Sequence, residues 1–291
     1  MDLWNAATIR DLFARHGFSF SGKLGQNFLV NPSVCPRMAQ ACGAGPETGV
    51  LEIGPGVGVL TAELSKRAKK VVAVEIDRRL KPLLKETLSP YENAEVVFGD
   101  VMELELNALL RERFLDCKEV VVCANLPYYI TSPILMHLLE SRLPVSRVTV
   151  MVQKEAAARL CAPVGSRESG AVTAAVNYYA RAEKLFSVSA GSFLPPPKVD
   201  SAVISLEIRE KPPFPVDDEA YFFRMVKAAF AQRRKTLPNA LSAGMGLPKA
   251  GLNRTLDRCG ISPTARAESL SMEALCELAN QLKRDQSAGG V

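Results

Sequence analysis

The sequence predicts an α/β chain in which a doubly wound sheet domain precedes a smaller helical domain. From residue 49 to residue 207, apolar runs with strand character alternate with segments of helical pattern. These runs are continuously apolar, as in strands of a parallel sheet that is buried on both faces. A proline-rich break at residues 210–219 is followed by mainly helical sequence, which completes the prediction.

Five strands come first in the predicted order. They are expected at residues 49–54, 70–77, 94–100, 119–125 and 147–153. Helical patterns follow four of them, at residues 60–68, 78–88, 132–142 and 154–160. Strands that alternate with helices in this way form βαβ units with parallel strands. Two later strands are expected at residues 183–189 and 201–209.

The proline-rich break sets the expected domain limits. Its prolines cannot lie in a helix interior or in a central strand. We therefore expect a sheet domain at residues 1–210, which begins with a helical segment at residues 1–23. A helical domain is expected at residues 211–291, and its first helical pattern covers residues 219–241.

Length and composition limit the class of protein. The chain has 291 residues, of which 47% are hydrophobic and 23% charged, as in globular proteins of about two domains. The net charge of +5 is compatible with a nucleic-acid partner but does not prove one. The N-terminus contains acidic residues, and no apolar run approaches the ~20 residues that span a bilayer. We expect a cytoplasmic protein without a membrane partner.

The seven cysteines do not predict a metal site. No C-x-x-C pair occurs, and only His16 and His137 could join the cysteines as ligands. Structural zinc sites need four such ligands at short spacings. We therefore expect no metal and reduced, mostly buried thiols.

A glycine loop follows the first expected strand. The segment "EIGPGVG" places Gly54, Gly56 and Gly58 between a strand and a helix, where glycine permits tight turning and close approach to a ligand. The dinucleotide fingerprint G-x-G-x-x-G would require glycine at position 59, which is Val59,. Such a loop can also be a simple turn.

Two acids end the next two strands. Glu75 could accept hydrogen bonds from ribose hydroxyls, and Asp100 could hold the exocyclic amine of adenine. With the glycine loop they would share one crevice at the carboxyl ends of successive strands. Pro55 lacks the N–H that a pyrophosphate would use. An adenosine ligand such as S-adenosylmethionine therefore fits better than NAD.

The turn "NLPY" follows the fourth strand and delivers Asn125 to the same crevice. It resembles the (N/D)-P-P-(Y/F) motif of methyltransferases that act on amino nitrogens of bases, and this resemblance implies the following roles. The side-chain oxygen of Asn125 could accept one hydrogen of an adenine N6 amine, and the carbonyl of Leu126 or Pro127 the other. The amine lone pair would then point at a donor methyl group, which needs placement rather than a strong base. Tyr128 offers a face on which an extruded base can stack.

The sequence closely resembles the ribosomal small-subunit RNA adenine N6,N6-dimethyltransferase family, the rRNA adenine dimethylases of the kasugamycin-resistance type. The resemblance rests on "LGQNFL", "EIGPGVGVLT", "VEID", "NLPYYITSPI" and "FLPPPKVDSAV" in this order. It implies a Rossmann-like class I S-adenosylmethionine-dependent methyltransferase domain with a small all-helical C-terminal domain. It also implies dimethylation of two adjacent adenosines in the 3′-terminal hairpin loop of 16S rRNA, within the small (30S) subunit or its precursor, as part of subunit biogenesis.

The resemblance assigns roles to individual residues. The expected cofactor-binding residues are Asn27, Leu29, Gly54, Gly56, Glu75, Ile76, Asp100, Val101 and Asn125. The expected catalytic residues are Asn125, Leu126, Pro127, Tyr128 and Phe193, of which Phe193 would cover the second face of the target base. The expected RNA-binding residues are Lys198 and the basic triplet Arg233, Arg234 and Lys235, whose side chains could bind phosphates. Ser169 departs from the family, which usually has a tyrosine at this position, so local RNA contacts there stay open.

Three other readings stay open at this point. A large-subunit RNA adenine methyltransferase of the antibiotic-resistance type would share the NLPY turn. A non-catalytic RNA-binding assembly factor or transcription factor could use the same fold without the cofactor residues. A nicotinamide oxidoreductase is disfavoured by the glycine spacing and by the NLPY turn.

Overall fold

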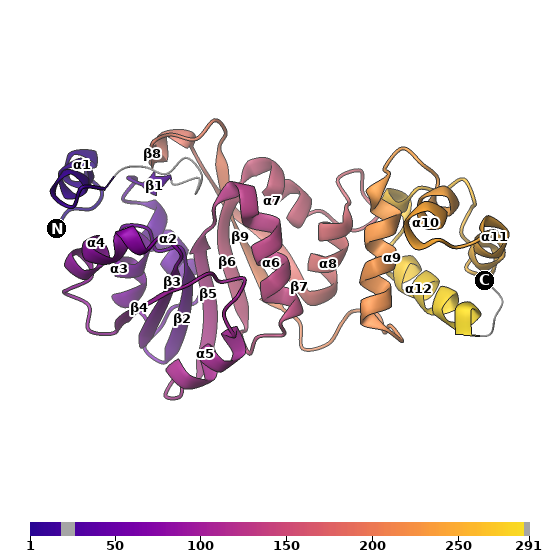
Figure 1. Cartoon of the computed structure of the whole chain (residues 1–291), viewed down its shortest axis with the longest axis horizontal. Coiled ribbons are helices and arrows are strands. Elements are labelled where there is room, and N and C mark those ends of the chain that lie inside the picture. The colour runs from indigo at the N-terminus through magenta and orange to yellow at the C-terminus, as the bar shows by residue number, and fades with distance from the viewer. Residues whose placement is uncertain (19–26, 288–291) are drawn as a thin grey trace. The chain divides into compact units, whose positions relative to one another are not determined.

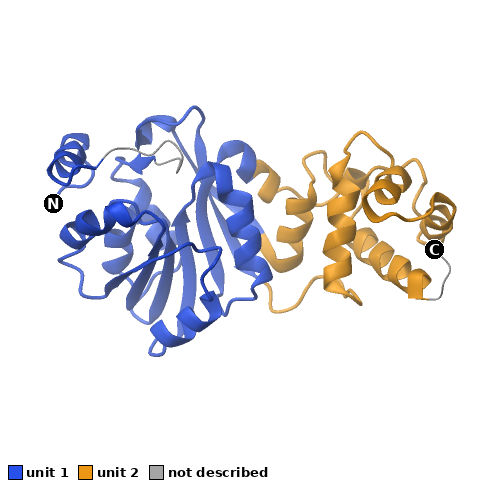
Figure 2. Ribbon diagram, viewed as in Figure 1, with its two compact units in different colours: residues 1–157, 182–208 blue, residues 158–181, 209–291 orange. Residues whose placement is uncertain are grey.

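The computed structural model describes residues 1–18 and 27–287, and the chain forms two compact units (Figure 2). Unit 1 comprises Met1–Ala157 and Ala182–Ile208, and unit 2 comprises Ala158–Arg181 and Arg209–Val291. The expected helical segment at residues 1–23 and the motif LGQNFL lie partly outside the described residues. Within them, helix α1 covers Ala6–Arg15, and the side chain of Asn5 caps its first turn,.

Unit 1 contains a seven-stranded sheet with the order β4-β3-β2-β5-β6-β9-β7 (Figure 1). The strands are β2 Thr48–Ile53, β3 Lys70–Glu75, β4 Ala94–Phe98, β5 Glu119–Asn125, β6 Arg147–Gln153, β7 Ala180–Val188 and β9 Ser201–Ile208. The first five strands pair in parallel, as expected, whereas β9 runs antiparallel to β6. The α/β fold class is therefore confirmed, with a mixed rather than wholly parallel sheet.

Burial explains why these segments are strands. Every residue of β2 is buried, and the interiors of β3, β5 and β6 are buried on both faces, as continuous apolar runs predict. Strand β4 differs, because it lies at the end of the sheet and is half-buried along its whole length.

The helices of unit 1 connect these strands (Figure 1). They are α2 Val34–Ala41, α3 Val59–Ser65, α4 Lys81–Thr87, α5 Leu106–Arg113, α6 Thr131–Glu140 and the first part of α7 Lys154–Leu160. Helices α2 and α5 were not expected from the sequence. Both have only eight residues, and Pro36 inside α2 resembles a break rather than a helix start.

A two-stranded antiparallel ribbon was also not expected. Strand β1 (Phe28–Leu29) pairs with β8 (Phe193–Leu194), with Leu29 opposite Phe193. Two-residue strands have no readable periodicity, so only the tertiary structure shows that these distant segments lie side by side. The ribbon contributes Phe28, Leu29 and Phe193 to the apolar core of unit 1.

Unit 2 is helical. Its helices are α8 Ala171–Tyr179, α9 Glu219–Ala231, α10 Leu237–Met245, α11 Lys249–Arg258 and α12 Met272–Ser287. The sequence division kept residues 158–181 with the sheet, whereas here they group with the C-terminal helices. The cause is an aromatic cluster, in which Tyr178 stacks on Phe222 and Tyr179 on Phe223, each with ring centroids 5.3 Å apart,.

The segment at residues 219–241, expected as one helical pattern, forms two helices, α9 and α10. Gln232 leaves the helical region with φ −129° and ψ 74°, and α10 begins at Leu237 with Pro238 in its first turn, where proline is tolerated. The basic triplet of residues 233–235 therefore lies in the connection between α9 and α10.

Two further findings concern the described residues as a whole. No helix among them is long and apolar enough to cross a membrane. All seven cysteines are free thiols, of which Cys35, Cys42, Cys123 and Cys276 are buried.

Candidate functional site

The strand order creates a crevice at the carboxyl end of the sheet. Strand β2 is central, the chain moves outward through β3 and β4, and it then returns to β5 on the other side of β2. At such a switch point the connections leave in opposite directions, and ligands bind outside the strand ends. Ile53 of β2 pairs with Val74 of β3 and Ala124 of β5, so the three strands end at the same edge of the sheet. The polar residues that follow them therefore lie close together.

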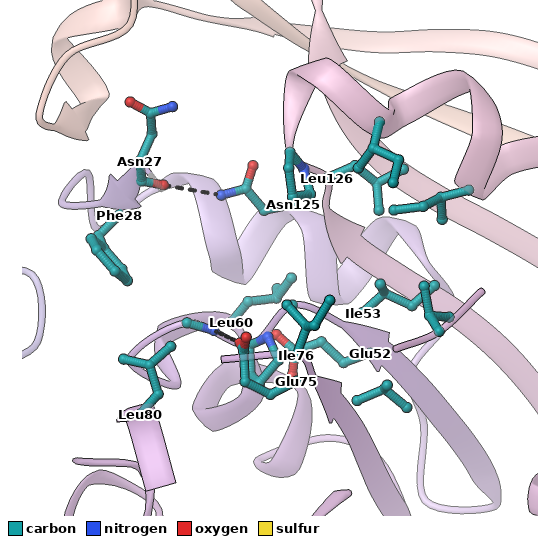
Figure 3. Close-up of a pocket in the computed structure, with 18 of the residues that line it drawn as sticks. Asn27, Phe28, Glu52, Ile53, Leu60, Glu75, Ile76, Leu80, Asn125 and Leu126 are labelled. Carbon is teal, nitrogen blue, oxygen red and sulfur yellow. Dashed lines mark hydrogen bonds between the residues drawn. The ribbon is translucent and has the colours of Figure 1, made fainter. Parts of the chain in front are cut away.

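A cavity occupies this crevice (Figure 3). It is lined by all nine residues that the sequence assigned to cofactor binding: Asn27, Leu29, Gly54, Gly56, Glu75, Ile76, Asp100, Val101 and Asn125. Leu126, Pro127 and Tyr128 line it as well. In Figure 3, Asn27, Asn125 and Leu126 lie on one side of the space, and Glu75, Ile76 and Leu80 lie on the other.

The glycine loop has the backbone that the sequence predicted. Gly54 and Gly56 have φ values of +70° and +60°, in the left-handed region that side chains disfavour,. A Cβ at Gly56 would also come within 3.1 Å of the Phe28 ring. Both glycines are therefore required by the turn between β2 and α3.

Glu75 is fixed by the backbone around it. One carboxyl oxygen accepts the N–H of Asp77 at 2.8 Å, and the other accepts the N–H of Gly56 at 3.2 Å. The residue is only 5% exposed, and this burial raises the pKa of its carboxyl above the ordinary value, partly opposed by the two backbone bonds,. Each oxygen keeps a lone pair, so Glu75 can still accept bonds from a ligand diol.

Asp100 lies at the next strand end. One of its oxygens accepts the N–H of Met102 at 2.9 Å, which leaves the other oxygen for a ligand. Ile76 is exposed and Val101 is buried, and both line the cavity. The two apolar side chains can flank a flat ring, while Asp100 contacts its polar edge.

Asn125 ends β5 and contacts Asn27 on its own side of the cavity. Its side-chain N–H donates to the backbone oxygen of Asn27 at 3.5 Å (Figure 3), which is a weak bond. In this orientation its side-chain oxygen accepts no bond from the described residues, and it remains free to accept a ligand N–H.

The backbone distinguishes the two carbonyl groups that the sequence left open. The Pro127 oxygen accepts the N–H of Ile130 at 3.2 Å and the hydroxyl of Thr131 at 3.1 Å. A carbonyl oxygen has two lone pairs, so Pro127 is fully used. The oxygen of Leu126 accepts no bond from the described residues. Of the two, Leu126 is thus the carbonyl available to a ligand amine.

The two tyrosines of the turn differ in burial. Tyr128 is half-buried, and its hydroxyl bonds to that of Ser201, which is fully buried at the start of β9. Burial raises the pKa of the Tyr128 phenol. Tyr129 is 60% exposed at the cavity. Ser201 thus fixes the ring of Tyr128, whereas Tyr129 is unconstrained by burial.

Phe193 and Lys198, two of the expected site residues of unit 1, do not line the cavity. Phe193 is 3% exposed and belongs to the apolar core, so its proposed stacking on a base stays a prediction that this packing does not favour. Lys198 is exposed in the connection between β8 and β9.

The basic triplet lies in unit 2. Arg233, Arg234 and Lys235 are all exposed, and Arg233 donates to the backbone oxygen of Arg167 at 2.6 Å. Three adjacent cations on a connection can reach phosphates.

Ser169, where the family usually has tyrosine, is 1% exposed. Its hydroxyl accepts the N–H groups of Gly165 and Ser166 at 3.0 and 3.1 Å and donates to the oxygen of Pro163 at 3.1 Å. A small hydroxyl therefore organises the loop from within, in a space where no aromatic ring would fit unchanged.

Sequence reasoning missed three residues of the site. Glu52 lines the cavity from inside β2, and Thr131 and Ser201 hold the NLPY turn from outside it. An acid within an otherwise apolar strand was a readable signal for Glu52, because buried carboxylates are rare without a purpose. No sequence signal linked Ser201 to Tyr128, which lies 73 residues away.

The site fits an adenosine-type cofactor. It combines apolar walls with a few polar groups in fixed positions, as small-ligand sites do. No group of three or more histidine, cysteine or acidic side chains that could hold a metal ion occurs among residues 1–18 and 27–287. The polar groups at the cavity include the carboxyl groups of Glu75 and Asp100 and the side-chain amide of Asn125.

Known proteins match this chain over most of its length. The family model described as ribosomal RNA adenine dimethylase matches residues 17–284. A ribosomal RNA small subunit methyltransferase A of Geobacillus thermodenitrificans is 46% identical over 286 residues, which are 97% of each chain. A protein of the same name from Bacillus mycoides is 48% identical over 276 residues, or 94% of each.

Two solved structures are also similar. A dimethyladenosine transferase from Plasmodium falciparum has a TM-score of 0.72 and 26% identity, covering 90% of this chain and 98% of its own. The 23S rRNA methyltransferase ErmE has a TM-score of 0.64 and 29% identity, covering 88% of this chain and all of its own. Both similarities support the Rossmann-like fold.

Proposed function

The chain belongs to the ribosomal RNA adenine dimethylase family, and from this premise we propose how it acts and on what. It is an rRNA adenine dimethyltransferase. Its substrates are two adjacent adenosines in the 3′-terminal hairpin loop of 16S rRNA, and each receives two methyl groups on N6. The observation that carries the proposal is the NLPY turn. It presents at the cavity two acceptors that no described residue occupies, the side-chain oxygen of Asn125 and the carbonyl of Leu126.

The proposed cofactor is S-adenosylmethionine, which supplies a methyl group on a positively charged sulfonium. Glu75 binds the ribose hydroxyls, and Asp100 accepts from the adenine amine. Gly54 and Gly56 allow the backbone to approach the amino-acid part, with Asn27 and Leu29 covering it. Ile76 and Val101 flank the adenine ring. These assignments rest on the position of each residue in the cavity and on its free acceptors.

The proposed chemistry is placement of the target amine. Adenine N6 is nearly planar because its lone pair is delocalised into the ring, and it must become tetrahedral to attack a methyl group. Asn125 accepts one N6–H and Leu126 accepts the other, which aims the lone pair at the methyl carbon. Leu126 replaces Pro127 in this role, since both lone pairs of Pro127 are used within the turn.

Tyr128 holds the target base in this arrangement. A base must leave its stack before its amine can enter the cavity, and an aromatic face compensates for the lost stacking by about 1–3 kcal/mol. Ser201 fixes the tyrosine hydroxyl, so the ring is oriented before the base arrives.

The proposed partner is 16S rRNA within the small subunit or its precursor, in the cytoplasm. The relatives at 46–48% identity carry the small-subunit name, and the basic triplet of unit 2 and Lys198 offer phosphate contacts. The rival substrate is 23S rRNA, since ErmE shares the fold at 29% identity.

The decisive experiment is methyl transfer to ribosomal subunits from cells that lack the modification. Nucleosides from each subunit are analysed by mass spectrometry after incubation with the full chain and S-adenosylmethionine. We expect dimethyladenosine in the small subunit alone. Label in 23S rRNA would support the rival substrate, and no dimethyladenosine in either would contradict the proposed activity.

A further inference from the structure

Glu52 is the most deeply buried carboxyl at the cavity. It lies one residue before the end of β2, it lines the cavity, and it is 1% exposed. Figure 3 shows it on the same side of the space as Glu75 and Ile53. One of its carboxyl oxygens has no hydrogen-bond partner among the residues that the structure describes. A buried, unpartnered carboxyl is costly, so its presence calls for a compensating ligand.

No cation of the described chain compensates Glu52. The titratable groups that face it are Glu75 of β3, Cys35 of α2, Cys42 directly after α2, and Cys123, its pairing partner on β5. All four are acids. The positive charge of Arg147 on β6 lowers the pKa of Cys42, and the Arg147 side chain donates to the backbone oxygen of Ala41. Lys66 forms a salt bridge with Glu63 of α3. Glu52 has no ion pair among the described residues.

This environment keeps Glu52 protonated at neutral pH when the cavity holds no cation. Burial raises its pKa to about 8, opposed in part by the nearby hydroxyl of Thr61 and increased by Glu75 and Cys42,. The proton can leave once a positive charge enters the cavity, because an opposite charge within ~4–6 Å lowers a carboxyl pKa by about 1–3 units.

We propose that Glu52 senses the charge of the bound ligand and thereby favours the sulfonium cofactor over its thioether product. The proposal rests on the assignment of S-adenosylmethionine to this cavity. Glu52 gives up its proton to solvent when the sulfonium is bound. It takes a proton back after methyl transfer, when the sulfur has become neutral. The two ligands share their ribose, adenine and amino-acid groups. The charge on the sulfur is therefore the difference between them to which the protonation of Glu52 responds.

The expected size of the effect follows from the two protonation states. If the cation lowers the pKa by about two units, Glu52 favours S-adenosylmethionine over S-adenosylhomocysteine about tenfold at pH 7 and about twofold at pH 6. Most of one proton is then released at pH 7 on binding of the cofactor, and close to none on binding of the product.

The test is calorimetry of both ligands with the full chain, in two buffers that differ in ionisation enthalpy. Glu52→Gln keeps the shape and removes the proton, so it should abolish proton release and reduce the cofactor preference about tenfold. Glu47→Gln is the matched control, because Glu47 is an exposed carboxyl immediately before the same strand, paired with Lys118. The Glu47→Gln variant should match the unaltered chain both in proton release and in its preference for the cofactor over the product.

If the Glu52→Gln variant releases as many protons on cofactor binding as the unaltered chain does, the proposal is overturned. A second measurement needs no variant: the affinity ratio of the two ligands in the unaltered chain should rise between pH 6 and pH 8, and a flat ratio would also overturn it. Failure of both ligands to bind would instead contradict the cofactor assignment, which separates the two outcomes.

Discussion

Glu75 is the residue on which cofactor affinity should depend most directly. Its carboxyl is already oriented by the N–H groups of Gly56 and Asp77, so a ligand diol meets a fixed acceptor. Glu75→Ala should weaken S-adenosylmethionine binding by about 1.5–3 kcal/mol, the range for hydrogen bonds to a charged group.

Calorimetry measures this change, and Glu75→Gln provides the control. Glutamine keeps one side-chain oxygen that can accept a backbone N–H. Comparison of the two variants therefore separates the loss of the loop's hydrogen bonds from the loss of the contact with the ligand. Unchanged affinity in Glu75→Ala would assign the ribose to another residue.

Asn125 should matter for chemistry more than for binding. Its side-chain oxygen gains strength as an acceptor when N6 rehybridises and its hydrogens become more positive. Asn125→Ala should therefore reduce the rate of methyl transfer about 10²–10³-fold, by analogy with the loss of one preorganised hydrogen-bond partner elsewhere. Affinity for the small subunit should change little, because phosphate contacts supply most of it.

Single-turnover methylation and filter binding on the same subunits test this prediction. The singly methylated amine has only one N–H left, so the variant should accumulate monomethyladenosine. Near-normal dimethylation would remove Asn125 from the catalytic role. Loss of binding with normal turnover at saturation would make the turn a docking element.

At the scale of elements, the short helix at Tyr128–Ile130 and the start of α6 hold the NLPY turn in shape. Thr131 is 4% exposed, and its hydroxyl donates to the Pro127 oxygen. With the bond from Ile130 this uses both lone pairs of that carbonyl,. Thr131→Val preserves volume and removes the bond. A net hydrogen bond is worth about 0.5–1.5 kcal/mol, so kcat should fall up to about tenfold.

The split between kcat and KM identifies this role. We expect the KM values for cofactor and subunit to stay close to those of the unaltered chain, and Thr131→Ser should restore kcat because it restores the hydroxyl. Equal turnover by Thr131→Val and Thr131→Ser would show that the bond does not position the turn.

The connection between α9 and α10 is the second element with a testable role. Replacing Arg233, Arg234 and Lys235 by glutamine should weaken binding to the small subunit. It should also flatten the salt dependence of binding by roughly 0.7 of a unit per lost phosphate contact on single strands. Lys118→Gln is the control, since Lys118 is exposed but paired with Glu47. A salt slope equal to that of the control would make the triplet an ordinary solvated surface.

At the scale of the whole molecule, buried acids make stability depend on pH. The folded chain holds the Glu52 proton up to about pH 8, and burial also raises the pKa of Glu75. The unfolded chain loses these protons near pH 4.5, the ordinary value. The folded state therefore binds more protons between these limits, and the free energy of unfolding must fall as pH rises through them.

Urea unfolding of the ligand-free chain at several pH values measures this loss. Glu52 alone should contribute a decrease of up to about 1.4 kcal/mol per pH unit between pH 5.5 and pH 7.5. Glu52→Gln should reduce the slope by that amount, and Glu47→Gln should leave it unchanged. If the free energy of unfolding falls equally with pH in Glu52→Gln and in the unaltered chain, the Glu52 carboxyl is ionised in the folded state.

The sequence alone determined the features that depend on local pattern. All seven strands of the sheet were predicted, and for β2, β3, β5 and β6 the continuous apolar runs were clear because burial on both faces leaves no alternation to misread,. The residues at the ends of β2, β3, β4 and β5 were predicted as one site, because parallel strands end at the same edge. Glycine spacing and the NLPY turn then indicated the ligand class and the chemistry.

Only the tertiary structure decided what depends on contacts between distant segments. Two-residue strands brought Phe193 into the core, and an aromatic cluster grouped residues 158–181 with the C-terminal helices. Hydrogen bonds from Ile130 and Thr131 selected Leu126 over Pro127 as the free acceptor. Burial gave Glu52 its proton at neutral pH. Each depends on which atoms surround a group in three dimensions, and packing and desolvation leave no periodic trace along the chain.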